Sequence, residues 1–109
     1  MKVNELASAL RLQSITEPDG EREIDGCSIG DLLSWVMGRA QSGNVWVTIM
    51  SNINIVAVAT LADVSCIVLA EGVTVEDSVK AVAEAKGVNL FTTPMTAYEI
   101  AAKIAALTV

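Results

Sequence analysis

Two strongly apolar segments, separated by fifteen residues, limit the possible folds of this chain more than any other feature. Residues 45–50 (VWVTIM) and 66–69 (CIVL) are dominated by β-branched and apolar side chains, a pattern typical of strands covered on both faces. Two parallel strands need a crossover of a dozen or more residues, and the intervening fifteen provide one. We therefore expect a β-α-β unit at the centre of the fold.

The crossover, residues 53–63, predicts a helix, although its composition would also suit a strand. Ile55, Val58, Ala59 and Ala62 recur at helical spacing on one face, and further apolar residues lie on the other. A helix that is apolar all round is buried on both sides. In a chain of 109 residues this arrangement suggests a second subunit, so we expect a homodimer.

The remaining segments extend this unit into an alternating pattern. Helices are predicted at residues 3–10, at 31–41, after Thr74, which would cap its helix, and at 92–107; strands are predicted at 12–16, 23–29 and 87–91. From Ile24 onward strands and helices alternate, and right-handed crossovers then give a mostly parallel sheet. We expect a three-layer α/β fold, with about five strands and helices on both faces, in a single domain over residues 1–109.

Two glycines, Gly26 and Gly30, precede the predicted helix at 31–41, as glycines do in many phosphate-binding loops. A P-loop has four residues between its glycines and then a lysine, whereas here three intervene and Asp31 follows. Asp31 also supplies a negative charge where an anion would bind the helix N-terminus. Capping by Ser28 or Asp31 at a tight corner is the simpler interpretation. Phosphate binding at Gly30 is the alternative.

Composition argues against several classes of function. The net charge of −6 disfavours nucleic acids and anionic membrane surfaces as partners. The chain has no histidine, which removes Ser-His-Asp triads, Cys-His dyads and histidine metal sites, and its two cysteines cannot form a structural zinc site alone. Cys66 should be buried in a strand, and Cys27 is the one candidate nucleophile. We expect no cofactor and no metal.

The most apolar region, residues 45–70, is interrupted by polar residues and by Asp63, which a membrane span would tolerate poorly. No signal peptide is evident at the N-terminus. The sequence thus predicts a cytoplasmic protein.

A ligand site is expected where the parallel strands end. Ligands of open α/β sheets bind in the crevice at the carboxyl ends of the strands. On the predicted map, small polar residues gather at that edge: Ser51, Asn52, Asn54, Glu71, Gly72, Thr92 and Thr93. They could bind a nucleotide or a phosphometabolite, but the same residue types also serve loops and helix caps.

The two tryptophans are expected to differ. Trp46 lies in a strand and should belong to the core. Trp35 lies off the inward face of its helix, with Leu32 and Arg39 nearby, so it either contacts a partner or packs at an edge.

The order of these segments resembles the DRTGG-domain family and the related N-terminal domain of the HPr serine kinase/phosphorylase, which shares its fold with the first domain of Mur ligases. The similar stretches are IDG…GDLLSWVMG at 24–38, NIVAVATLADVSCIVLAEGV at 54–73 and AVAEAKGVNLFTTPMTAYEIAAKI at 81–104. This chain has SNIN at 51–54 and AEG at 70–72, where relatives tend to carry Thr-Gly-Asp-Arg-like and Thr-Gly-Gly-like turns. The resemblance implies a small regulatory or ligand-sensing module, often dimeric and often fused to CBS-pair, pyrophosphatase or acetyltransferase domains.

Overall fold

The two central apolar segments form neighbouring parallel strands, as the sequence predicts. In the computed structural model, which describes residues 1–108, β3 (Val45–Thr48) pairs with β4 (Cys66–Leu69), and Val45 lies opposite Cys66. Every residue of both strands is buried. The crossover between them is α3 (Asn54–Ala62), which confirms the helix.

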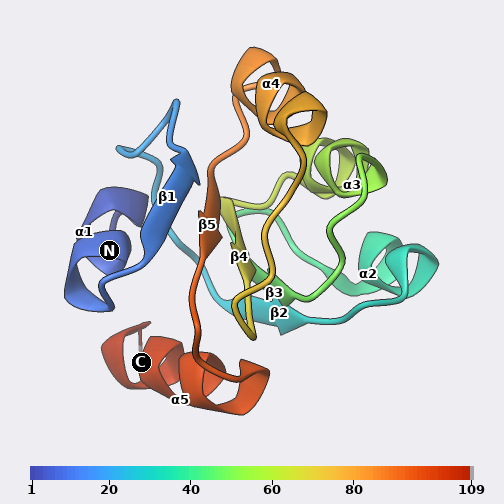
Figure 1. The fold of residues 1–109 in the computed structure, drawn as a ribbon. Coiled ribbons are helices and arrows are strands. Elements are labelled where there is room, and N and C mark those ends of the chain that lie inside the picture. The colour runs from blue at the N-terminus through green and yellow to red at the C-terminus, as the bar shows by residue number, and fades with distance from the viewer. Residues whose placement is uncertain (109) are drawn as a thin grey trace.

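Within residues 1–108, five strands form one sheet in the order β1-β5-β4-β3-β2 (Figure 1). β2 (Cys27–Ile29), β3, β4 and β5 (Leu90–Thr92) run parallel, and β1 (Gln13–Thr16) pairs antiparallel with β5. The predicted mostly parallel sheet is therefore confirmed. β1 and β2 follow each other in the chain but lie at opposite edges. Val109, the last residue of the predicted domain, lies outside the described residues.

Helices cover both faces of the sheet, which confirms the three-layer arrangement (Figure 1). α2 (Leu33–Arg39), α3 and α4 (Asp77–Ala85) pack on one face, around the fully buried Trp46. α1 (Val3–Ala9) and α5 (Ala97–Thr108) pack on the other, around Phe91 and Ile100. None of the helices within residues 1–108 has the length and apolarity needed to cross a bilayer.

Two predicted helix boundaries are wrong because other residues end or begin the helices. α2 stops at Arg39, before the predicted end at residue 41, because Ala40 turns to extended backbone. Gly43 lies in the turn before β3 with a φ of +84°, and its N–H donates to the Asp63 carbonyl at 2.9 Å. α4 begins at Asp77, and Glu76 rather than Thr74 occupies the N-cap position.

The last helix also begins later than predicted, because β5 extends through Thr92. The Thr93 N–H donates to the Leu69 carbonyl at 2.9 Å, which continues the sheet beyond β5. α5 then starts at Ala97, where Thr96 and Glu99 form a capping box: each side chain accepts a hydrogen bond from the backbone N–H of the other.

A buried polar residue precedes each of β3, β4 and β5: Asn44, Ser65 and Asn89. The Ser65 N–H and hydroxyl both donate to the Asn44 carbonyl, at 2.8 and 2.9 Å. The Asn89 Nδ2 donates to the carbonyls of Ser65, at 3.0 Å, and Asp19, at 2.8 Å. These bonds join the amino ends of three strands, and we call the three residues the amino-edge network.

Candidate ligand site at the carboxyl edge of the sheet

The carboxyl ends of β3, β4 and β5 bring most of the predicted site residues to one edge of the sheet. These residues are Ser51, Asn52, Glu71, Gly72, Thr92 and Thr93. After β4 the chain crosses to α4 on one face, whereas after β5 it crosses to α5 on the other (Figure 1). Connections that diverge in this way leave a crevice between the strand ends.

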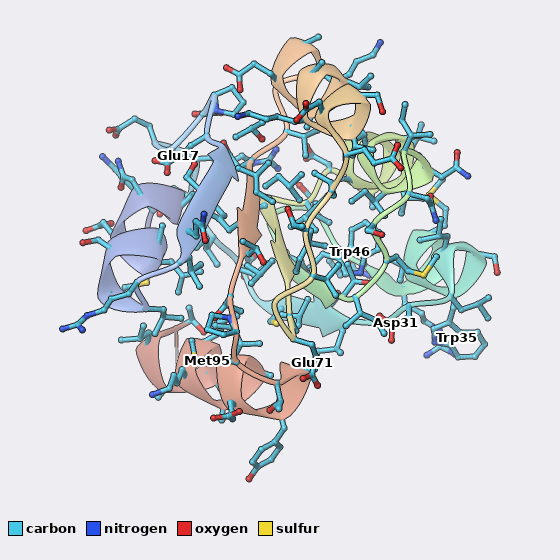
Figure 2. The ribbon with its side chains drawn as sticks, viewed as in Figure 1. Glu17, Asp31, Trp35, Trp46, Glu71 and Met95 are labelled. Carbon is cyan, nitrogen blue, oxygen red and sulfur yellow. The ribbon has the colours of Figure 1, made fainter. Side chains whose placement is uncertain are left out.

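Hydrogen bonds between the two diverging loops fill the inner part of that crevice. The Glu71 N–H donates to the Met95 carbonyl, and the Gly72 N–H donates to the Thr93 carbonyl, both at 2.8 Å. Figure 2 shows Glu71 beside Met95 next to α5. Because these backbone groups bond to each other, a ligand would contact the surfaces on either side of the turn.

The turn after β4 has an uncommon backbone conformation. Glu71 and Gly72 both have positive φ angles, of +61° and +72°, and the Val73 N–H donates to the Ala70 carbonyl at 3.1 Å. Positive φ at both central residues is typical of a type I′ turn. Gly72 adopts it without cost, whereas Glu71 has a Cβ that disfavours it.

Two hollows flank this turn. The strand hollow, of about 470 Å³, lies between β1 and the ends of β4 and β5. It is lined by Gln13, Ile15, Gly72, Thr74, Thr92, Thr93 and Pro94. The helix hollow, of about 580 Å³, lies where α3 and α4 begin. It is lined by Ser51, Asn52, Ile53, Thr74, Val75, Glu76, Ser78 and Val79. Thr74 borders both, so the two hollows are adjacent.

The helix hollow offers hydroxyl and amide groups rather than positive charge. The hydroxyls of Ser51, Thr74 and Ser78 belong to its lining, and within residues 1–108 no lysine or arginine lines either hollow. Asn52 is committed in part, because its Oδ1 accepts the N–H of Asn54 at 2.9 Å. The N-termini of α3 and α4 favour an anion, whereas the carboxylate of Glu76 opposes one.

At the β2 end of this edge, Asp31 joins the loop after β2 to the loop after β3 by hydrogen bonds, so its predicted role as helix cap is wrong. Its Oδ1 accepts hydrogen bonds from the Thr48 hydroxyl at 2.8 Å and the Ile49 N–H at 3.0 Å. α2 has Leu32 at its N-cap, without a side-chain bond. Ser28, the other predicted cap, donates to Asn44 instead.

Gly30 lies at the corner between β2 and α2, where both of its backbone groups are occupied. Its N–H donates to the Val47 carbonyl at 3.2 Å, and its carbonyl accepts the indole N–H of Trp46 at 2.9 Å. A Cβ at this position would stand 3.0 Å from Val36. The glycine therefore permits close packing of α2, and its amide does not face a ligand.

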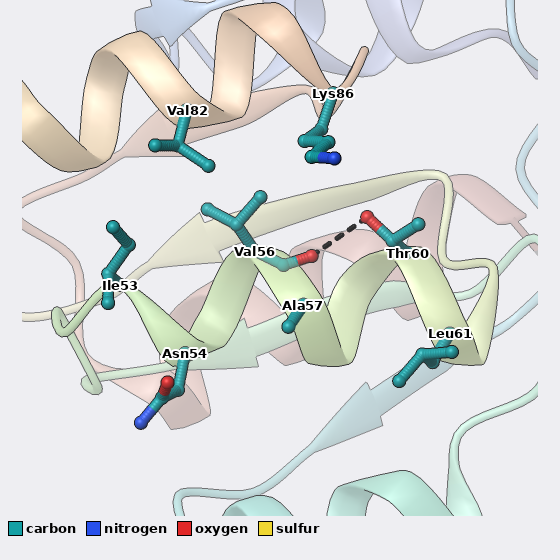
Figure 3. Close-up of a pocket in the computed structure, with 8 residues that line it drawn as sticks. All are labelled: Ile53, Asn54, Val56, Ala57, Thr60, Leu61, Val82 and Lys86. Atoms are coloured by element: carbon teal, nitrogen blue, oxygen red, sulfur yellow. Dashed lines mark hydrogen bonds between the residues drawn. The ribbon is translucent and has the colours of Figure 1, made fainter.

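Asn54 is the one predicted site residue in the described chain that lines a third hollow, a groove between α3 and α4 (Figure 3). This α3–α4 groove, of about 390 Å³, is mostly apolar, with Val56 and Val82 facing each other and Lys86 at one end. A side-chain hydrogen bond within it joins the Thr60 hydroxyl to the Val56 carbonyl of the same helix. Asn54 begins α3, and the groove runs from there along the helix.

The two cysteines are both free thiols. Cys66 is buried, as predicted, and desolvation raises its pKa to about 12. Cys27 lies on the edge strand β2, where desolvation raises its pKa to about 11. A thiol must ionise to act as a nucleophile, so both are poorly suited to catalysis near neutral pH.

Sequence reasoning did not assign Thr74, Glu76 and Ser78 to the candidate site. Thr74 was expected as a cap, and the other two as parts of a helix. They follow β4 on the chain, so the rule that strand ends share an edge applies to them equally. Because α4 starts only at Asp77, these side chains lie beside the N-terminus of α3, and the sequence does not show that late start.

Comparison with known proteins agrees with this fold. The DRTGG domain family matches residues 5–107, and the chain belongs to that family. It also superposes on the CBS and DRTGG domains of the regulatory region of Clostridium perfringens pyrophosphatase, solved in complex with the activator diadenosine tetraphosphate. The TM-score is 0.68 at 12% sequence identity, covering 93% of this chain and 44% of that one. This chain thus spans less than half of that structure, and the likeness shows the fold. No curated protein sequence matches the chain.

Proposed function

We propose that this chain is a regulatory domain that senses a nucleotide or other phosphorylated small molecule, acts as a homodimer and has no catalytic activity of its own. One observation carries the proposal: 93% of the chain superposes on a regulatory region that was solved with a nucleotide activator. Membership of the DRTGG family supports the regulatory role. The relation to the HPr kinase domain and the cytoplasmic location stay predictions from the sequence.

The ligand is proposed to bind at the carboxyl edge, in the helix hollow and the adjoining strand hollow. Ser51, Thr74 and Ser78 supply hydroxyls there, and two nine-residue helices begin beside them. Since neither hollow is lined by lysine or arginine within residues 1–108, phosphate would be held by hydroxyl and N–H donors. We therefore expect moderate affinity and recognition of the nucleoside as well as of the phosphate.

Binding is favoured over catalysis by the state of the candidate nucleophile. The raised pKa of Cys27 keeps its thiol protonated at neutral pH, and the chain has no histidine to act as a general base. The exposed side chains of Leu32 and Trp35, at the start of α2, support the homodimer, because apolar side chains exposed this far favour a partner surface.

Thermal unfolding with a ligand panel tests the proposal. Diadenosine tetraphosphate, ATP, AMP, adenosine and inorganic phosphate would each be added at millimolar concentration. A ligand at ten times its Kd stabilises the fold by about 1.4 kcal/mol, which corresponds to roughly 5 °C in Tm for a domain of this size. We expect such a shift with at least one nucleotide. Absence of any shift across the panel would contradict the ligand-sensing role.

A substitution at Glu76 tests whether the phosphate binds in the helix hollow. Removing the negative charge by Glu76→Gln should tighten the binding of the nucleotide that shifts Tm by roughly threefold to tenfold and leave adenosine unaffected, because only phosphate is repelled by that charge. Glu84→Gln is the matched control, since Glu84 lies near the other end of α4. Calorimetric titration measures both. Equal changes in nucleotide affinity for the two variants would show that the phosphate does not bind in the helix hollow.

A further inference from the structure

The two edges of the sheet differ in how they are protected against pairing with another strand. β1 ends the sheet with the polar side chains of Gln13 and Ser14 exposed, as is common for edge strands. β2 ends the other side with Cys27 and Ile29 exposed, and Ile29 is 56% exposed. The β2 edge therefore presents apolar side chains next to an unpaired backbone.

The ladder between β2 and β3 fixes which backbone groups of β2 face outward. The Gly30 N–H donates to the Val47 carbonyl at 3.2 Å, and the Gly26 carbonyl accepts from β3 at 3.0 Å. Alternate residues of a strand direct their N–H and C=O groups to opposite sides. The N–H and C=O groups of Cys27 and Ile29 consequently point away from the sheet.

One flank of α2 lies at the same edge of the sheet, on the face opposite to the Cys27 and Ile29 side chains. Leu32, Trp35 and Arg39 recur at helical spacing, and Leu32 and Trp35 are 66% and 57% exposed. The Arg39 guanidinium lies over the Trp35 ring, 4.3 Å from its centroid. Figure 2 shows Trp35 on the side of α2 that faces away from α3. The exposed tryptophan and the exposed strand thus belong to the same end of the molecule.

We infer that β2 and this flank of α2 form the interface with a second copy of the chain, related by a two-fold axis through Ser28. This inference rests on the homodimer of the proposed function and names its surface. Antiparallel pairing about Ser28 places Cys27 of each copy opposite Ile29 of the other, so that the outward backbone groups of both are satisfied. The same rotation lays α2 antiparallel beside its copy and covers Trp35.

Charge favours a second copy as the occupant, and the small area of the surface limits its affinity. α2 follows Asp31 and ends at Arg39, so the antiparallel arrangement brings Arg39 toward Asp31 of the second copy. An extended peptide could pair with β2 but would leave Trp35 exposed. The large exposed apolar side chains of this surface are Ile29, Leu32 and Trp35. Together with a strand of three residues they make a contact smaller than the roughly 800 Å² per partner of a standard interface, so we expect a micromolar dimer.

Sedimentation of four proteins, each at several concentrations, tests the surface. Trp35→Glu and Leu32→Glu should raise the dimer dissociation constant by about tenfold or more, since each places a charge in the contact. Leu61→Glu is the matched control, because Leu61 is 71% exposed on α3. It should leave the dissociation constant of the wild-type chain unchanged. All replaced side chains are exposed, and urea unfolding confirms that each variant folds.

Cross-linking tests the register independently. In a Cys27→Ser background, Ser28→Cys would face its own copy across the axis in a non-hydrogen-bonded pair, where Cα atoms lie about 4.5 Å apart and a disulfide can form. We expect covalent dimer under mild oxidation, and none from Thr60→Cys on α3. Failure of Ser28→Cys to cross-link a chain that does dimerise would overturn the pairing.

The outcomes separate this inference from the proposed function. If the wild-type chain dimerises and Leu61→Glu dissociates it while Trp35→Glu does not, the β2 surface is wrong and the homodimer stands. If the wild-type chain is a monomer at 100 µM and above, roughly a hundred times a 1 µM Kd, both the homodimer and this surface are overturned. The ligand panel then still decides the sensing role.

Discussion

The amino and carboxyl edges of the sheet carry similar polar residues, but these residues are buried at the amino edge and exposed at the carboxyl edge. At the amino edge, Asn44, Ser65 and Asn89 are buried, and their side chains bond to neighbouring backbone. At the carboxyl edge, Ser51 and Thr74 are exposed and border hollows. Residue type alone therefore does not distinguish a structural polar group from a binding one; burial and hydrogen-bond partners do.

The largest expected effect comes from breaking the amino-edge network. Asn89→Ala removes a side chain that donates to two carbonyls and accepts the Asp19 N–H, and it leaves buried groups without partners. We expect a loss of about 2–4 kcal/mol in the free energy of unfolding. Asn52→Ala, at the exposed carboxyl edge, should cost about 0.5–1 kcal/mol. Urea unfolding measures both, and equal losses would remove the contrast between the edges.

A smaller loss of unfolding free energy is expected at the end of β3, where a buried polar side chain at the carboxyl edge bonds to neighbouring loops. The Thr48 hydroxyl donates to Asp31 and accepts the Met50 N–H at 3.1 Å, and Thr48 is buried. Thr48→Val keeps the shape and removes both bonds, so we expect a loss of about 1–2 kcal/mol in chemical denaturation. A neutral result would show that Asp31 does not stabilise the loop after β3.

Relief of backbone strain should give a gain. Glu71 adopts a φ of +61°, which glycine adopts without steric cost. Glu71→Gly should therefore stabilise the fold by roughly 0.5–1 kcal/mol in urea unfolding, provided that the turn stays unchanged. Lys80→Gly, at an exposed position in the interior of α4, should lose a similar amount and serves as the control. Destabilisation by Glu71→Gly would mean that its side chain contributes more than its strained backbone costs.

The smallest expected effect is a shift in acid titration beside the amino edge. Hydrogen bonds from Ser42 and the Arg22 guanidinium lower the pKa of Asp63 below its ordinary value. A lowered pKa in the folded state means that the contribution to stability is present above the unfolded pKa and is lost as pH falls through the folded one. NMR titration should show Asp63 ionising at lower pH in the folded chain than in a denatured one. An unshifted Asp63 would mean that Arg22 does not pair with it in solution.

The fold could be predicted from the sequence because burial determines its pattern. The runs at residues 45–50 and 66–69 have no polar face to expose, so they require a covered, parallel sheet. Helix ends were harder to predict, because they depend on long-range partners. Asp31 looks like a cap in sequence but bonds to Thr48, which is seventeen residues away.

The candidate site could be predicted in part. The rule that parallel strands end at one edge placed Ser51, Gly72 and Thr93 at the same edge, where Gly72 and Thr93 line one hollow and Ser51 lines the adjacent one. It could not separate Asn54, which begins α3 and lines a different groove. Nor could it show that backbone bonds between the loops at Glu71 and Met95 divide the edge into two hollows.

Amide chemical shifts during titration with diadenosine tetraphosphate would test the central claim most directly. The proposed function predicts that the largest changes fall at the carboxyl edge, at Asn52, Gly72 and Thr74 among others, and that Asn44 and Asn89 stay unchanged. Largest changes at the amino edge, or none anywhere at millimolar ligand, would contradict the claim that the open polar edge of this sheet is its binding face.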